Sequence, residues 1–417
     1  MNQPKPMLSV AEALDFLLAG AIAVTETETL PTLEANGRVL ALAQQSQLDV
    51  PPMDNTSMDG YAVRAADCVS GSAVLEVAQR IPAGHVGQPL KAGTAARIFT
   101  GAMVPQGADA VVMQEVCVAD KDGERDIVTI NHAPASGEWI RRAGEDIRAG
   151  STILEAGTRL RAQELGLAAS VGLAKLPVVR KLRVAVFFTG DELAMPGDEL
   201  KPGAIYNSNK FTLRGLLQNL HCDITDFGIV PDTLAATRET LRRAAEEHDL
   251  IITSGGVSVG EEDHIKPALE AEGRVNMWQI AVKPGKPLAF GEVNRSSQSG
   301  EQSGRAFFLG LPGNPVSSFV TFLLFVRPFI LRLQGVQNVA PKAVTLRADF
   351  ALPKGDRRNE FLRARINAQG GLDLFPNQSS GVLTSTVWGD GLIDNPPNNP
   401  IAPGDLVRFL PFGDLMY

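Results

Sequence analysis

The sequence predicts a multidomain protein of the α/β plus β class, built around a central three-layer α/β domain with a mostly parallel sheet. Strand-like apolar runs alternate with helical patterns from about residue 180 to residue 335, which is typical of βαβ units. Short apolar runs separated by Gly and Pro occupy 51–140 and the chain after 340, where they indicate two smaller β domains. At roughly 100–200 residues per domain, the 417 residues can hold about two to four domains.

Four domains are expected along the chain. They are an N-terminal helical and linking domain of residues 1–50 and 141–178, an inserted β-rich domain of 51–140, an α/β substrate-binding domain of 179–335, and a small C-terminal β-barrel-like domain of 336–417. The first begins with a helix, because five apolar residues from Val10 to Leu18 recur at helical spacing. Ser9 and Glu12 can form a capping box at the start of this helix.

The α/β domain is expected to alternate strands with helices. The predicted strands are 182–188, 223–230, 250–252 and 306–309, and the predicted helices are 210–220, 233–247, 264–270 and 316–333. Right-handed crossovers between such strands place helices on both faces of a largely parallel sheet. The polar stretch 294–304 is predicted to be a hairpin loop rather than a linker.

Composition excludes several classes of protein. The net charge is −8 and the basic residues do not cluster, so a nucleic-acid partner is not expected. Three dispersed cysteines without a Cys-x-x-Cys motif argue against disulfides and a zinc site, and they fit a reducing, cytoplasmic location. The longest apolar run, Phe319–Val326, is shorter than the ~20 residues of a membrane span, so no membrane association is expected.

Three predicted strands run directly into polar turns rich in Gly or Pro. Ligands of open parallel sheets bind beyond the carboxyl ends of the strands, where such turns meet. The turns are 189–192, 253–263 and 310–315, and they contain Ser254, Gly255, Gly256, Ser258 and Gly260 together with Pro312, Gly313, Asn314 and Pro315. The second turn is rich enough in glycine for its backbone to approach a phosphate, although a tight connection that binds nothing has the same pattern.

Two familiar motifs are matched only in part by this second turn. Gly255 and Gly260 have the spacing of the Walker A glycines, but Glu261 and Glu262 stand where that loop has Lys and Ser or Thr. Gly256–Gly260 also reads Gly-x-Ser-x-Gly, yet the chain offers no separately placed acid and histidine after it. The turn is therefore neither a P-loop nor a nucleophile elbow.

Charged residues accompany these turns. Glu192 and Asp263 follow two different strands, and converging carboxylates hold Mg²⁺, although each acid alone could equally be a helix cap or a solvated loop residue. Lys283 and Lys286 belong to a Lys-Pro-Gly-Lys-Pro segment, whose stiff backbone suits an oxyanion or phosphate, or alternatively a basic surface turn. The residues alone thus predict a small, phosphorylated anionic ligand held with a divalent cation.

Eight motifs in a fixed order give the chain a family resemblance. They are Asp54–Arg64, Arg97–Ala102, Arg141–Ile147, Thr189–Leu193, Ser254–Gly260, Lys283–Pro287, Leu311–Pro315 and Gln378–Ser385. The chain resembles the molybdopterin molybdotransferases, the family that includes bacterial MoeA and the E domain of gephyrin, over nearly its whole length. The resemblance implies insertion of molybdate into adenylated molybdopterin, with Mg²⁺-dependent hydrolysis of the adenylate and release of molybdenum cofactor and AMP.

The resemblance also assigns residues. By motif match, the implied catalytic residues are Asp59, Thr100, Asp146, Glu192, Asp232, Asp263 and Lys283, with Glu192 and Asp263 as Mg²⁺ ligands. The implied ligand-binding residues are Ser254, Gly255, Gly256, Ser258, Gly260, Lys286, Pro312, Gly313, Asn314, Pro315 and Ser380. A homodimer is implied as well, in which Asp59 and Thr100 act across the interface. Further expected partners are the upstream adenylyltransferase and downstream molybdoenzymes.

The chain departs from the family pattern at two positions, and two other functions are compatible with the sequence. Gln279 stands where some relatives carry Lys, and Asn207 stands where relatives often have Asp. The chain could instead be the related molybdopterin adenylyltransferase, although the extra domains argue against it. It could also be a non-catalytic cofactor carrier or scaffold, although no partner-binding tail or linker is visible.

Overall fold

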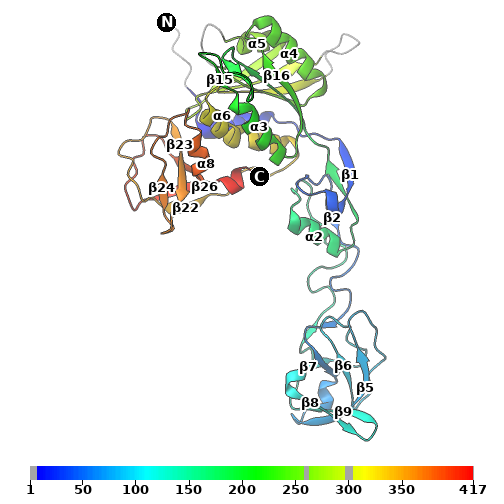
Figure 1. Cartoon of the computed structure of the whole chain (residues 1–417). Coiled ribbons are helices and arrows are strands. Elements are labelled where there is room, and N and C mark those ends of the chain that lie inside the picture. The colour runs from blue at the N-terminus through cyan, green and yellow to red at the C-terminus, as the bar shows by residue number, and fades with distance from the viewer. Residues whose placement is uncertain (1–6, 258–262, 296–303, 417) are drawn as a thin grey trace.

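The computed structural model describes residues 7–257, 263–295 and 304–416. Figure 1 shows an elongated chain: the α/β part and the C-terminal β part lie side by side at one end, and the 51–140 region lies at the other. A small region containing β1, β2 and α2 connects them. The predicted fold class, a multidomain α/β plus β protein, is confirmed. The exact domain boundaries stay predictions.

The central sheet has six strands in the order β16-β13-β17-β21-β20-β18. They are β13 (Arg183–Thr189), β16 (Asp223–Val230), β17 (Leu250–Ser254), β18 (Gly273–Gln279), β20 (Pro287–Asn294) and β21 (Arg305–Leu311). The first four strands of the order are parallel to one another, as predicted, whereas β20 is antiparallel to both of its neighbours. Strands β18 and β20 were not predicted, because neither is followed by a helix and the predicted strands were those that alternate with helices. The predicted hairpin at 294–304 agrees with the pairing of Asn294 with Arg305, although 296–303 lie outside the described residues.

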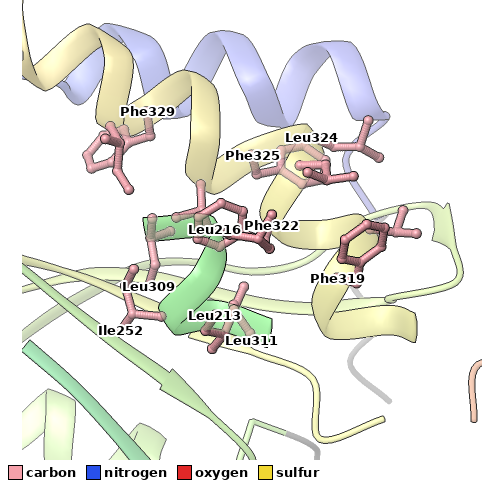
Figure 2. Close-up of a cluster of buried hydrophobic side chains, with 14 of the residues drawn as sticks. Leu213, Leu216, Ile252, Leu309, Leu311, Phe319, Phe322, Leu324, Phe325 and Phe329 are labelled. Carbon is pink, nitrogen blue, oxygen red and sulfur yellow. The ribbon is translucent and has the colours of Figure 1, made fainter. Parts of the chain in front are cut away.

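Helices cover both faces of this sheet, which confirms the three layers. One face carries α1 (Val10–Gly20), α3 (Ser208–Asn219), α6 (Pro315–Thr321), a π-helical segment (Phe322–Val326) and α7 (Arg327–Leu333), and the other carries α4 (Leu234–Glu247) and α5 (Ile265–Glu272). Successive strand residues point to opposite faces, so Val184 and Val186 join the first core while Ala185 and Phe187 join the second. Figure 2 shows how Phe322, Phe325 and Phe329 pack over Leu309 and Ile252 in the first core. The two cores fix the strand ends from which the site is built.

One helical stretch, Pro315–Leu333, is long and apolar enough to cross a membrane by length and composition. Its mean hydropathy is 1.7, but 94% of the window lies buried inside the fold. It is a core helix of the α/β part. The capping box predicted at Ser9 and Glu12 is present at the start of α1.

Smaller sheets build the remaining parts. The 51–140 region holds β4 (Gly60–Val63), β5 (Ala73–Ile81), β6 (Thr94–Ile98), β7 (Ala110–Met113), β8 (Cys117–Asp122) and β9 (Arg125–Ile130), with the short helices η2 (Ala65–Asp67) and η3 (Gln114–Val116). The C-terminal sheet holds β19 (Val282–Lys283), β22 (Val344–Arg347), β23 (Asn359–Ile366), β24 (Leu372–Leu374), β25 (Gly391–Asn395) and β26 (Leu406–Pro411), next to α8 (Thr384–Trp388) and α9 (Phe412–Leu415). Because β19 comes from the α/β part, the C-terminal sheet is joined to it by backbone hydrogen bonds.

Four two-stranded sheets complete the described structure. They are β1 (Thr27–Pro31) with β12 (Lys175–Val179), β2 (Gln44–Gln45) with β11 (Thr152–Leu154), β3 (Asn55–Thr56) with β10 (Ile140–Arg141), and β14 (Leu193–Ala194) with β15 (Ile205–Tyr206). The helices here are η1 (Thr32–Glu34) and α2 (Ala162–Ser170). The second helix ends before Gly172, where the chain turns with a φ of +81°.

Candidate functional site

A cavity of about 1100 Å³ opens at the carboxyl ends of the parallel strands. Residues following β13, β17 and β21 line it, as the sequence analysis expected for polar turns at this edge. The segment 283–287 and the C-terminal residues Arg358 and 378–383 close it from the other side. The cavity therefore lies between the α/β part and the C-terminal β part.

Hydrogen bonds around Ser254 tie these turns together. The Ser254 hydroxyl is 2% exposed and donates to the carbonyl of Pro312 at 3.0 Å. The side-chain amide of Asn209 donates both to Ser254 Oγ, at 2.8 Å, and to the carbonyl of Gly313, at 2.8 Å. The start of α3 and the turns after β17 and β21 are thus held in one arrangement before any ligand binds.

Glycine is required where the second turn passes over the end of β13. Gly255 has a φ of +105°, and a Cβ atom there would lie 2.4 Å from the carbonyl oxygen of Thr189. Gly256 has a φ of +63°, and its Cβ would lie 2.8 Å from Thr189 Oγ1. Both the backbone conformation and the close approach exclude a side chain at these positions. The backbone of this turn is therefore exposed to the cavity without side chains in the way.

Carboxylates gather on one side of the cavity. Glu192 and Asp232 line it, while Asp263 lies directly behind Gly256, at 3.8 Å from the position of a Cβ there. Burial, reinforced by the nearby charge of Asp232, raises the pKa of Asp263 to about 6, although a backbone hydrogen bond from Ile265 and the neighbouring His264 act in the other direction. Asp263 Oδ2 is buried and has no hydrogen-bond partner among the described residues. These three residues are called the acidic wall below.

Cations also line the cavity: Lys283, Lys286 and Arg358. Lys283 Nζ lies 3.0 Å from Glu360 Oε1 and 3.2 Å from Asp356 Oδ2. Arg358 donates to both carboxylate oxygens of Asp356, at 3.1 and 3.2 Å. Burial works to lower the pKa of Lys283, but the hydrogen bonds to Glu360 and Asp356 outweigh it and raise this pKa. Lys283 and Arg358 are called the cationic wall.

Helix starts add further donors at the cavity. Asn207 caps α3 by accepting from the backbone N–H of Lys210 at 3.1 Å, and Asn314 and Pro315 begin α6, which continues helically to Leu333. Asn207 and Asn314 both line the cavity, so two helix N-termini open onto it. Such ends carry partial positive charge, which favours anions, although Pro315 has no N–H and the N–H groups of Lys210 and Val316 already have partners. The Val316 N–H donates to the carbonyl of Ser380 at 3.0 Å, which attaches the loop after β24 to the same rim.

Most of the residues predicted for the site come together in this cavity. They are Glu192, Asp232, Ser254, Gly255, Gly256, Lys283, Lys286, Pro312, Gly313, Asn314, Pro315 and Ser380. Asp263 stands just behind the lining. The predicted residues Ser258 and Gly260 lie outside the described residues.

Asp59, Thr100 and Asp146 are not part of this cavity within one chain. Asp59 and Thr100 flank the sheet of the 51–140 region at the far end of the molecule (Figure 1). The backbone N–H and hydroxyl of Thr100 donate to Asp59 Oδ1 at 2.8 and 2.7 Å, and these bonds lower the pKa of Asp59. Asp146 is exposed in the loop that returns from this region. The Asp59–Thr100 pair is therefore preformed, but far from the acidic and cationic walls.

The acids do not form a complete metal centre on their own. Among the described residues, no group of three or more His, Cys, Asp or Glu side chains is placed to hold a metal ion. Mg²⁺ usually takes only one or two carboxylates and completes its shell with water and substrate phosphates. A buried carboxylate oxygen without a partner, beside a second acid, fits a cation that arrives with its ligand.

Sequence reasoning missed several lining residues, of which Arg358 is the most consequential. It comes from a charged run in the C-terminal part, and only the pairing of β19 with β23 brings that run to the cavity. Asn209 was not predicted as a site residue, although two Asn residues at a helix start are a signal for capping and loop bridging. Tyr206 and Gln378 also line the cavity.

Comparison with known proteins decides the family. Residues 8–172 match the MoeA N-terminal region (domain I and II), residues 185–332 match a probable molybdopterin binding domain, and residues 345–412 match the MoeA C-terminal region (domain IV). The chain is 40% identical over 422 aligned residues to a molybdopterin molybdenumtransferase of Haemophilus influenzae, covering 98% of this chain and 100% of that protein. This chain belongs to the MoeA family.

Other MoeA relatives agree in sequence and in structure. A molybdopterin molybdenumtransferase of Nostoc is 38% identical, over 84% of this chain and 79% of that protein. A crystal structure of a molybdopterin biosynthesis MoeA protein from Pyrococcus horikoshii is 29% identical and superposes with a TM-score of 0.82, covering 97% of this chain and 100% of that one. The family resemblance predicted from the eight motifs is confirmed, and the MoeA fold accounts for the elongated shape seen here.

Proposed function

We propose that this chain is a molybdopterin molybdenumtransferase. It inserts molybdate into adenylated molybdopterin, hydrolyses the adenylate with Mg²⁺, and releases molybdenum cofactor and AMP in the cytoplasm. The observation that carries the proposal is one cavity of about 1100 Å³ that both the acidic wall and the cationic wall border. The names of relatives that match nearly the whole chain support the same reaction.

The two walls suit the two halves of this chemistry. The glycine turn at Gly255 and Gly256 and the two helix starts offer backbone N–H groups to the phosphates of the adenylate. Lys283 and Arg358 offer directed donors to a tetrahedral oxyanion such as molybdate. Bound together in one cavity, the phosphate and the oxyanion would be held in fixed relative positions, which lowers the entropic part of the barrier.

Glu192 and Asp263 are the residues that would hold Mg²⁺. Asp263 Oδ2 has no hydrogen-bond partner within the described part of the chain, and this together with the raised pKa of Asp263 fits a carboxylate whose counter-ion comes with the substrate. A Mg²⁺ ion bound there would neutralise the negative charge that develops on the leaving phosphate. The protein's own task at this wall is to present ionised oxygens toward the phosphates, which requires Asp263 to lose its proton.

In a homodimer, residues that lie far from the cavity of their own chain could contribute to the cavity of the other subunit. We propose that the Asp59–Thr100 pair and Asp146 approach the cavity of a second subunit, since the extended chain holds them far from its own. Mixing Asp59→Asn subunits with Glu192→Gln subunits tests this directly. If the site is shared, mixed dimers contain one intact site, and random mixing restores about a quarter of the wild-type rate. No recovery above the two separate variants would contradict a shared site.

The reaction itself is tested with purified protein, adenylated molybdopterin, molybdate and Mg²⁺. We expect AMP release that depends on molybdate and stops when EDTA removes Mg²⁺. Adenylation of free molybdopterin by ATP would instead indicate the adenylyltransferase reaction. Tight binding of molybdopterin without consumption of molybdate would indicate a carrier.

A further inference from the structure

Two carboxylates, the buried Glu360 and the partly buried Asp356, contact the cationic wall. Asp356 accepts from Arg358 through both oxygens and also contacts Lys283, so one carboxylate bridges the two cations of the wall. Glu360 has a side-chain exposure of 4% and accepts from Lys283 Nζ through Oε1. Its other oxygen accepts from the backbone N–H of Asp356 at 2.9 Å. Neither acid lines the cavity, so both reach a ligand only through Lys283 and Arg358.

The backbone fixes this network across two parts of the molecule. Lys283 is the last residue of β19, and it pairs with Glu360 in the register of β23. The next glycine of the lysine segment, Gly285, packs so closely on α6 that a Cβ atom would lie 2.4 Å from Thr321 Oγ1. The lysine is therefore anchored at its backbone by two elements and at its ammonium group by two acids.

The charges of the network cancel. Lys283 and Arg358 contribute two positive charges, and Asp356 and Glu360 contribute two negative charges, so their sum is zero. These four residues add no net charge to the cavity, which Lys286 also lines, yet they still present N–H donors in a fixed geometry. Recognition at such a wall depends on the shape and hydrogen bonds of the ligand rather than on its charge alone.

We propose that Asp356 and Glu360 are positioning residues that orient Lys283 and Arg358 and cancel their charge, so that the cavity selects its oxyanion by geometry and releases others readily. A purely structural role would make their loss reduce stability, anion binding and turnover together. The positioning role predicts a split: loss of a carboxylate strengthens indiscriminate anion binding while it weakens catalysis. The inference deepens the proposed function, on which its turnover measurement rests.

The test uses sulfate, a tetrahedral dianion that does not titrate between pH 5 and 9, and the full-length protein. Asp356→Asn and Glu360→Gln should each bind sulfate about 3- to 10-fold more tightly than wild type by calorimetry, because each leaves one uncompensated positive charge at the wall. The same variants should show a kcat for AMP release about 10-fold lower, since the two donors are no longer held in place. Asp356→Glu keeps the charge and should bind sulfate as wild type does.

Asp405→Asn is the matched control, because it removes the same charge from an exposed position of the C-terminal part that does not line the cavity. It should leave both sulfate binding and turnover within about 2-fold of wild type, as for surface charges in general. Unchanged or weaker sulfate binding in both Asp356→Asn and Glu360→Gln would overturn the inference. Absence of turnover in wild type would count against the proposed function instead, and the sulfate titrations would still decide the inference.

Discussion

The two walls of the cavity differ in whether their charged side chains already have partners of opposite charge within the protein. On the cationic wall, Lys283 and Arg358 are both held by carboxylates at 3.0 to 3.2 Å. On the acidic wall, Asp263 has a buried oxygen without a partner among the described residues and a pKa raised to about 6. A paired charge is already in position before the ligand arrives, whereas an unpaired one needs the ligand's own counter-ion.

This difference has an energetic meaning. A buried polar group without a hydrogen bond costs roughly 1–3 kcal/mol, so the unpaired state of Asp263 is a cost to the fold. Such strained groups persist where the surrounding structure holds them and where binding relieves the cost. The acidic wall is thus the part of the site whose energy should change most when cation and phosphate bind.

Loss of the acidic wall should have the largest effect. We expect Glu192→Gln to lower kcat for AMP release by about 100-fold or more, because the amide cannot supply the negative charge that a cation at the phosphate requires. The neighbouring Asp191→Asn is the control, since Asp191 is exposed and does not line the cavity. Equal rates for Glu192→Gln and wild type would remove Glu192 from the mechanism.

The glycine turn allows a second comparison, between a strained glycine and a relaxed one. Gly256→Ala should destabilise the protein by about 2 kcal/mol, since its φ is +63° and the new Cβ would meet Thr189 Oγ1 at 2.8 Å and Ile265 Cγ1 at 2.9 Å. Gly166→Ala lies inside α2 with nothing within 4 Å of its Cβ, so it should instead stabilise by about 0.5–1 kcal/mol.

Thermal unfolding of these two glycine variants gives the measurement, and AMP release adds a functional readout. Gly256→Ala should also reduce turnover, because the turn forms the cavity lining, whereas Gly166→Ala should not. If both variants shifted stability in the same direction, the strain assigned to Gly256 would be wrong.

Sequence reasoning went far where local pattern decides the structure. The parallel strands, their helices and the polar turns at one sheet edge follow from hydrophobic periodicity and the rule for α/β ligand sites, and they placed Glu192 and Ser254 in one cavity. What it missed depends on contacts between distant segments. The hydrogen-bond partners of Lys283 lie more than 70 residues away in the sequence, as its bond to Glu360 shows, and no local sequence pattern predicts them.

The smallest expected effect tests the unpaired acid without any substrate. The folded pKa of Asp263 is about 6 against an ordinary value of 3.8, so the folded state holds this proton more tightly than the unfolded state. Stability contributed by the protonated form is therefore lost as pH rises from about 4 to about 6, and Asp263→Asn escapes that loss. The full shift corresponds to about 3 kcal/mol at most, and partial solvent access reduces the expected gap to about 1 kcal/mol.

Melting curves of wild type and Asp263→Asn, recorded from pH 4 to pH 8 in EDTA, measure that gap. Near pH 4 the melting temperatures of the two proteins should nearly coincide, and above pH 6 the variant should have the higher melting temperature. Millimolar Mg²⁺ with AMP should then narrow the gap by stabilising the wild type more than the variant, because the variant lacks one of the two carboxylates proposed to hold the cation. A difference between the two proteins that stays constant across this pH range would mean that Asp263 ionises normally, and the contrast between the two walls would disappear.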